Sequence, residues 1–207
     1  MKKVLHLIAS PRAAYSHSRH LATYFLDKLQ KKHPEFKIEE IDLFATKLPE
    51  FSEAGANAKF KDNHNIPMTK EERKQWEDAK KYCLEFKSAD AIVISLPMWN
   101  FSIPYQLKHY IDLITQPRWL FNTSETGYSG LMDGKKALLV YASGGCYESP
   151  ETAQFDFQSS YMSLWANFIG LKVYETTVHS TDIPVDHIKI EKEAKERLDD
   201  ILEDFCA

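Results

Sequence analysis

Ala91-Ile92-Val93-Ile94-Ser95-Leu96 is an almost uninterrupted apolar run, and the loop Pro97-Met98-Trp99-Asn100-Phe101 follows it directly. Two other runs have the same form, from Val4 to Ala9 and from Ala137 to Ala142. Short apolar runs bounded by turn residues are typical of strands that are buried on both faces of a parallel sheet. The three runs therefore predict core strands whose carboxyl ends lie along one edge of that sheet.

Helical patterns alternate with these strands. Leu21, Phe25 and Leu29 recur every four residues, and the helix that they predict ends at Pro34. Thr69-Lys70-Glu71-Glu72 is a capping-box pattern that opens a second helix. Further helices are expected from Pro104, whose ring suits a first helical turn, and over residues 152–168 and 188–205. With two more expected strands, at 37–43 and 172–178, the alternation predicts an α/β fold with a doubly wound, five-stranded parallel sheet.

The 207 residues are enough for a single domain over 1–207 and do not require two. Two stretches have no clear period: residues 44–68, which we interpret as a lid or interface segment, and the long connection 116–134. A formal net charge of −4 argues against a nucleic-acid partner, and no run reaches the roughly 20 apolar residues that cross a membrane. Three widely spaced cysteines without a CxxC pattern predict no metal site and a reducing, cytoplasmic location.

The first loop has the residues of a phosphate site. Ser16-His17-Ser18 stands where the first helix should begin, and a helix start offers unpaired amides and partial positive charge to an anion. Ser10 adds a hydroxyl, and Arg12 and His17 add local charge. There is no G-x-G-x-x-G, so a terminal monophosphate suits this loop better than a pyrophosphate. The alternative is that Ser16 or Ser18 only caps the helix.

The second and third loops suit a flat ring. Pro97 to Phe101 supplies aromatic faces, with Met98 beneath the ring and the amides of Trp99, Asn100 and Phe101 at its polar edge. Ser143-Gly144-Gly145 lets the backbone approach closely, and the amides of Gly145 and Cys146 would stabilise a negatively charged reduced ring. A hydrophobic plug and a plain glycine turn are the alternatives. The three loops at one edge make FMN the best candidate ligand.

These motifs resemble the FMN-dependent NADH-azoreductases, within the wider flavodoxin-like NAD(P)H:quinone oxidoreductases. The resemblance covers nearly the whole chain and is strongest at residues 16–18, 97–104, 107–112, 134–137 and 143–145. It implies a three-layer, flavodoxin-like fold and a homodimer with two FMN sites at the subunit interface. It also implies ping-pong transfer of two electrons from NADH or NADPH to quinones or azo compounds. Gln116-Pro117-Arg118-Trp119 departs from the Ala-Gly turn that is usual there.

Three aromatic residues are candidates for the wall of an acceptor pocket: Phe121, Tyr147 and Phe168. Phe168 also fits the apolar face of its helix, and Tyr147 is either a proton donor or a surface residue. The sequence leaves the choice between NADH and NADPH open, because Arg12, Arg118 or lysines are the candidate contacts of a 2′-phosphate. Two other functions remain as alternatives: a flavodoxin-type electron carrier and a hydrolase that binds phosphodiesters without flavin.

Overall fold

A computed structural model describes residues 2–206 of the chain. Its centre is a five-stranded parallel sheet in the order β2-β1-β3-β6-β7. The order runs outward in both directions from the boundary between β1 and β3, which is the doubly wound arrangement that the sequence predicts. The strands are β1 (Lys2–Ile8), β2 (Phe36–Asp42), β3 (Ala91–Pro97), β6 (Lys136–Ala142) and β7 (Lys172–Val178).

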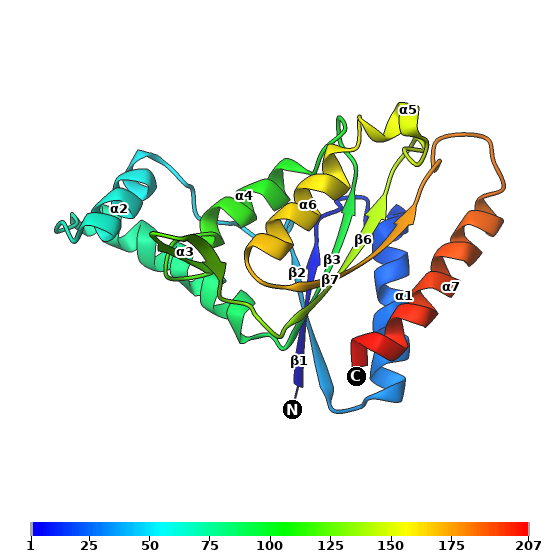
Figure 1. Ribbon diagram of the computed structural model, residues 1–207, viewed down its shortest axis with the longest axis horizontal. Helices are drawn as coiled ribbons and strands as arrows, with labels where there is room; N and C mark the ends of the chain where they lie inside the picture. The colour runs from blue at the N-terminus through cyan, green and yellow to red at the C-terminus, as the bar shows by residue number, and fades with distance from the viewer. Residues whose placement is uncertain (1, 207) are drawn as a thin grey trace.

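Helices cover both faces of the sheet and complete three layers (Figure 1). On one face α1 (His17–Lys32) and α7 (His187–Cys206) pack over a core that includes Phe25 and Leu198. On the other face lie α3 (Lys70–Ser88), α4 (Tyr105–Ile114) and α6 (Phe157–Phe168). Parallel strands are buried on both faces in this arrangement, which explains why the strand sequences are apolar at nearly every position.

Several local predictions are confirmed and three need correction. Strand β7 has the expected bounds, and Thr69 and Glu72 form the expected capping box of α3. The unperiodic segment 44–68 contains a helix, α2 (Glu53–His64), which extends to the left in Figure 1. The helix expected over 152–168 is two helices, because α5 (Pro150–Ala153) ends before Asp156 caps α6. Pro104 is the N-cap of α4 and lies just before the first turn.

The connection 116–134 also has structure that the sequence analysis did not predict. It forms an antiparallel hairpin of β4 (Phe121–Ser124) and β5 (Gly127–Gly130), outside the main sheet. Gly127 has a φ of +123°, a conformation that glycine adopts without a steric penalty. The hairpin packs where α6 ends, since Met132 donates its amide to Ile169 O at 2.9 Å.

A polar chain crosses the sheet beneath α1. His6 on β1 is fully buried and bridges its two neighbouring strands. Its Nδ1 lies 3.0 Å from Glu40 Oε1 on β2, and its Nε2 lies 2.9 Å from Ser95 Oγ on β3. Both ring nitrogens therefore have partners, as a buried polar group requires. The helices within residues 2–206 are all too short or too polar to span a lipid bilayer.

Candidate functional site

The loop after β1 ends in the capped start of α1. Ser16 is the N-cap, and its Oγ accepts from the amide of Arg19 at 3.3 Å. Ser16 and Ser18 are buried, with their hydroxyls 3.4 Å apart. The amides of His17 and Ser18 have no acceptor within residues 2–206. Ser16 therefore caps the helix, and the same turn presents two unpaired donors and the positive helix end to an anion.

The charged residues of this loop lie close enough to interact. Burial lowers the pKa of His17 from its ordinary 6.5, and the neighbouring Arg12 guanidinium lowers it further. Arg12 itself is exposed, whereas Ser10 is only 2% exposed. An anion bound here would offset the repulsion between His17 and Arg12. The loop therefore favours a negatively charged group.

The loop after β3 is a tight turn in an unusual backbone conformation. Asn100 has a φ of +48° and Phe101 a φ of +69°, and both values lie in the left-handed region. Trp99 and Ser102 flank the turn and exchange two backbone hydrogen bonds of 2.9 and 3.0 Å. Such strain costs about 1–3 kcal/mol per residue and is concentrated at functional sites. Phe101 O accepts from the amide of Phe157 at 3.0 Å, which ties the turn to α6.

These bonds change the set of available donors. The Trp99 amide is occupied by Ser102, so it is not the free donor that the sequence analysis expected. The amides of Asn100 and Phe101 have no acceptor in the part of the chain that the structure describes. Pro97 and Met98 are partly buried behind them, and the Met98 amide is paired with Ala142 O at 2.7 Å. The turn thus presents two unpaired amides next to partly buried apolar side chains.

The loop after β6 lies against the loop after β7. Ser143 donates its amide to Val178 O at 3.0 Å, and its hydroxyl donates to Gly145 O at 2.8 Å. Gly145 O also accepts from the amide of Ser180 at 3.0 Å. The amides of Gly145 and Cys146 have no acceptor among the described residues. The two loops therefore hold each other in place and leave these two donors unpaired.

Sequence reasoning missed the contribution of the loop after β7. A Cβ on Gly144 would lie 2.5 Å from Asp182 Oδ2, so glycine lets the Asp182 side chain approach this closely without moving aside. Thr181 and Asp182 donate their amides to Ser143 O and Gly144 O, at 3.1 and 3.3 Å. The same rule that selected the other three loops, the carboxyl end of a parallel strand, would have found residues 179–182.

The three aromatic candidates lie in two places. Tyr147 follows β6 at the carboxyl edge, where its ring is 6.4 Å from that of Phe101. Phe121 and Phe168 contact each other, with ring centroids 4.9 Å apart, and Tyr128 lies 5.6 Å from Phe168. This second group lies at the amino edge, because Phe168 ends α6 just before β7 begins. One chain does not bring Tyr147 together with Phe121 and Phe168.

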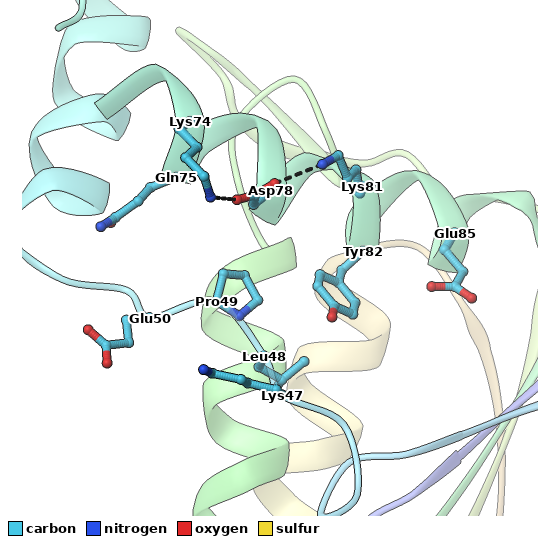
Figure 2. Close-up of a pocket in the computed structure, with 10 residues that line it drawn as sticks. All are labelled: Lys47, Leu48, Pro49, Glu50, Lys74, Gln75, Asp78, Lys81, Tyr82 and Glu85. Carbon is cyan, nitrogen blue, oxygen red and sulfur yellow. Dashed lines mark hydrogen bonds and ion pairs between the residues drawn. The ribbon is translucent and has the colours of Figure 1, made fainter. Parts of the chain in front are cut away.

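The molecule has two larger cavities, one beside these loops and one away from them. A cavity of about 600 Å³ runs along α4 and includes Trp99, Asn100 and Tyr161 in its lining. A second, of about 660 Å³, lies between residues 47–50 and α3 (Figure 2). Its lysines Lys74 and Lys81 are paired with Asp78, at 2.7 and 2.8 Å. The loops after β1, β3 and β6 contribute no residue to the lining of this second cavity, so it is separate from the candidate site.

The strand-end loops fit FMN by the chemistry of their donors. The unpaired amides of His17 and Ser18 suit a phosphate at the end of a helix. The polar edge of a flavin ring is lined by carbonyl and nitrogen acceptors, and the other four unpaired amides are donors that complement such an edge. Those four amides belong to Asn100, Phe101, Gly145 and Cys146.

Comparison with known proteins gives the same family. Residues 2–202 match a family model described as a flavodoxin-like fold. A relative from Burkholderia lata, named FMN-dependent NADH:quinone oxidoreductase 9, is 35% identical over 94% of this chain and 97% of its own length. A relative from Desulfotalea psychrophila, named FMN-dependent NADH:quinone oxidoreductase, is 41% identical over 83% of this chain and 82% of its own length.

Solved structures agree with these relatives. An azoreductase from Bacillus anthracis superposes with a TM-score of 0.91 at 29% identity, covering 99% of this chain and 100% of that one. An FMN-dependent NADH-azoreductase from the same species, solved in complex with FMN, has a TM-score of 0.90 at 28% identity and covers both chains completely. With the family model and the two relatives, these matches show that the chain belongs to the flavodoxin-like family of FMN-dependent NADH:quinone oxidoreductases and azoreductases.

Proposed function

We propose that this protein is an FMN-dependent NAD(P)H oxidoreductase that reduces quinones or azo compounds by ping-pong transfer of two electrons. The observation that carries the proposal is the set of unpaired main-chain amides on three loops at one edge of the sheet. The relatives with 35% and 41% identity, named as FMN-dependent NADH:quinone oxidoreductases, support it. The loops would hold FMN by its phosphate at α1 and by its ring between the other two loops.

In this proposal FMN supplies the redox chemistry, since it accepts a hydride from the nicotinamide and delivers two electrons to the acceptor. The chain would bind FMN, orient its ring and tune its reduction. The unpaired amides of Gly145 and Cys146 would direct N–H dipoles at the part of the ring that becomes negative on reduction, and this would favour hydride acceptance. Phe101, held in the left-handed region, would present an aromatic face beside the ring.

NADH is the donor that we propose, as in the names of the relatives. Of the residues considered for a 2′-phosphate contact, Arg118 is already engaged. Its guanidinium donates to Asp62 Oδ2 at 2.5 Å and to Asp62 O at 3.2 Å. Arg12 is exposed and remains the candidate for NADPH. Steady-state kcat/KM values for the two donors, in wild type and Arg12→Ala, test this choice.

The first test is the visible spectrum of protein reconstituted with FMN. Flavin bands that bleach with NADH under anaerobic conditions and return on addition of a quinone support the proposal. Bands that persist with both NADH and NADPH would favour an electron carrier. A protein that retains no FMN would contradict the proposal that FMN is the ligand and would favour the hydrolase alternative.

We further propose that the enzyme is a homodimer whose acceptor pocket is completed across the interface. Tyr147 and the Phe121–Phe168 pair lie at opposite edges of one chain, so a shared pocket requires a second copy. Large apolar side chains at the carboxyl edge and on α6 are also exposed, as expected of a surface that a partner covers. They are Phe101, Tyr105, Phe155, Phe157 and Leu164.

Subunit complementation tests this arrangement. Gly144→Val would block one FMN loop, because the new side chain overlaps Asp182. The double variant Phe121→Ala/Phe168→Ala would remove the aromatic pair. If the pocket is shared, a mixed dimer has one intact site, so mixing two inactive variants restores activity. Mixing that restores nothing, or a monomer in sedimentation equilibrium, would contradict the shared pocket.

A cytoplasmic location, proposed from the three cysteines without a CxxC pattern, is tested by cell fractionation.

A further inference from the structure

A cluster of three metal-ligand side chains lies where the loops after β6 and β7 meet. The ligand atoms of Cys146, Glu148 and His179 all lie within 4.8 Å of one another. Cys146 Sγ is 4.0 Å from Glu148 Oε2, and His179 Nε2 is 3.5 Å from the same oxygen. Glu148 and His179 are 31 positions apart in the sequence, so no short motif reveals the cluster.

The backbone fixes the two segments that supply these side chains. Val178 O accepts from the amide of Ser143, and the amide of Ser180 donates to Gly145 O, each at 3.0 Å. These two bonds involve the residues on either side of His179, which are Val178 and Ser180. The second bond joins Ser180 to Gly145, the residue just before Cys146. The cysteine and the histidine are therefore brought together by the strand-end loops and not by side-chain contacts alone.

The imidazole of His179 is oriented as in a metal site. Its Nδ1 lies 3.0 Å from Ser180 Oγ, and Ser180 is 5% exposed. Metal-bound histidines almost always bond the second ring nitrogen to a nearby polar group, which fixes the ring and its tautomer. The bond to Ser180 leaves Nε2 free to face Glu148, with the His179 side chain only 20% exposed.

The two separations that involve Glu148 are close to those of a tetrahedral zinc site, and the cysteine–histidine pair lies within 4.8 Å. Zinc bonds of about 2.3 Å to sulfur and about 2.0–2.2 Å to nitrogen or oxygen place tetrahedral ligand atoms roughly 3.4–3.6 Å apart. The histidine–carboxylate separation of 3.5 Å already agrees with this range. The cysteine–carboxylate separation of 4.0 Å requires a contraction of only a few tenths of an ångström. The Glu148 side chain is 67% exposed, so it is free to make that adjustment.

A fourth position is available next to the cluster. Glu148 and His179 both line a cavity of about 60 Å³, which is large enough for water. Gln158 also lines this cavity, is 2% exposed, and its Nε2 has no hydrogen-bond partner among the described residues. A metal-bound water in the cavity would give this buried amide an acceptor.

We propose that Cys146, Glu148 and His179 form a site for a divalent transition metal of the zinc type, with water as the fourth ligand. After Cys146 has released its thiol proton to solvent, the thiolate and the carboxylate together carry two negative charges. With a neutral imidazole, they balance the charge of M²⁺. Sulfur and imidazole select zinc or cobalt over magnesium and calcium, which prefer oxygen. The bound ion would link the loop beside the proposed ring site to the loop after β7.

The test is metal binding by the full-length protein, which does not depend on the proposed redox activity. Equilibrium dialysis against buffered Zn²⁺ should find one equivalent per chain. Co²⁺ should give the visible bands of a tetrahedral ion and a thiolate charge-transfer band. His179→Gln, Glu148→Gln and Cys146→Ser should each weaken zinc binding at least tenfold. Ser180→Ala should weaken it about tenfold, the effect expected when a partner of a ligating histidine is lost.

Cys83→Ala and His187→Gln are matched controls, since each removes one cysteine or histidine outside the cluster and should leave zinc affinity unchanged. Circular dichroism of each variant separates loss of binding from loss of folding. Substoichiometric zinc in the wild type would overturn the proposal. So would binding that His179→Gln leaves unchanged, or a Co²⁺ spectrum that is lost in Cys83→Ala and kept in Cys146→Ser.

Discussion

The two edges of the central sheet are built in opposite ways. At the amino edge the backbone is closely packed: the Lys135 ammonium donates to Lys87 O and Ala89 O, and Gly130 lies against Ile169 and Gly170. At the carboxyl edge, amides are left unpaired and non-glycine residues adopt left-handed conformations. The same parallel sheet thus has one edge optimised for stability and one whose hydrogen-bonding groups are reserved for a ligand.

Glycine substitutions should show this difference most strongly. A Cβ on Gly130 would lie 2.2 Å from the Ile169 carbonyl carbon, a backbone atom that cannot move aside. A Cβ on Gly144 would meet only the Asp182 carboxylate, which can rotate. We expect Gly130→Ala to lower the free energy of unfolding by about 3 kcal/mol and Gly144→Ala by about 1 kcal/mol. Urea denaturation measures both losses of stability. FMN titration should show that the folded Gly144→Ala protein binds FMN weakly, and that Gly130→Ala does not have this effect. Equal losses of stability would contradict the comparison.

Helix caps give the next largest effect. Ser16 and Thr69 are both N-caps with an Oγ acceptor 3.3 Å from an amide, but only Ser16 lies in a candidate FMN loop, since Thr69 follows helix α2. Replacing either with alanine should cost about 1 kcal/mol of stability. Ser16→Ala should also weaken FMN binding at least tenfold, whereas Thr69→Ala should leave it unchanged. Fluorescence quenching of FMN gives the affinities, and a similar loss for Thr69→Ala would remove Ser16 from the phosphate site.

The strained turn should separate stability from binding. Phe101→Gly relieves a left-handed conformation that costs about 1–2 kcal/mol, while it loses aromatic contacts of similar size. The free energy of unfolding should therefore stay within about 1 kcal/mol of wild type while FMN affinity falls severalfold. Phe155→Ala is the control, because it removes the 6.0 Å ring contact with Phe101 and leaves the turn intact. A Phe101→Gly protein that binds FMN normally would show that the strain serves no flavin contact.

A bound phosphate should change the titration of His17. Burial and Arg12 hold its pKa below 6.5 in the free protein. An anion at the start of α1 favours the charged imidazole, so the pKa should rise when FMN binds. NMR titration of the histidine resonances with and without FMN measures the shift. A His17 pKa that falls when FMN binds would contradict the phosphate position.

The smallest effect concerns the interior of the sheet. The hydrogen bond from His6 lowers the pKa of Glu40 below its ordinary 4.5. A lowered folded-state pKa adds stability that is complete above pH 4.5 and disappears as the pH falls through the folded value. Glu40→Gln should therefore reduce stability at pH 7 slightly and weaken the loss between pH 5 and pH 3. Urea midpoints across that range test this. An unchanged pH profile would show that the bond between His6 and Glu40 does not affect stability.

The sequence was most informative where one local pattern determines the structure. Apolar runs located β1, β3 and β6, the outer strands β2 and β7 were also expected, and Thr69 with Glu72 located the start of α3. Helix α2 escaped notice because its apolar residues do not recur on one face, and only Gly55 and Ala58 of it are buried. The break between α5 and α6 was not apparent either. Asp156 caps α6 there, but the helical pattern of apolar residues continues beyond it.

The candidate site was predicted in part for the same reason. Strand ends identify loops but do not say which amides stay unpaired, because the bond between Trp99 and Ser102 depends on two left-handed residues. The approach of His179 to Cys146 depends on the pairing of β6 with β7, which the chain order alone does not specify. The separation of Tyr147 from Phe168 likewise follows from the direction of α6 across the sheet.

The strand order also has a consequence for the timing of folding. Strand β1 is the first to leave the ribosome, yet in the sheet it lies between β2 and β3. Its pairing with β3 requires Ala91 to Ser95, which are made much later. At 5–20 residues per second that delay is on the order of ten seconds. During synthesis, an apolar strand destined for the centre of the protein therefore exists with one edge unpaired, and this interval is when the nascent chain is most exposed to aggregation and most dependent on chaperones.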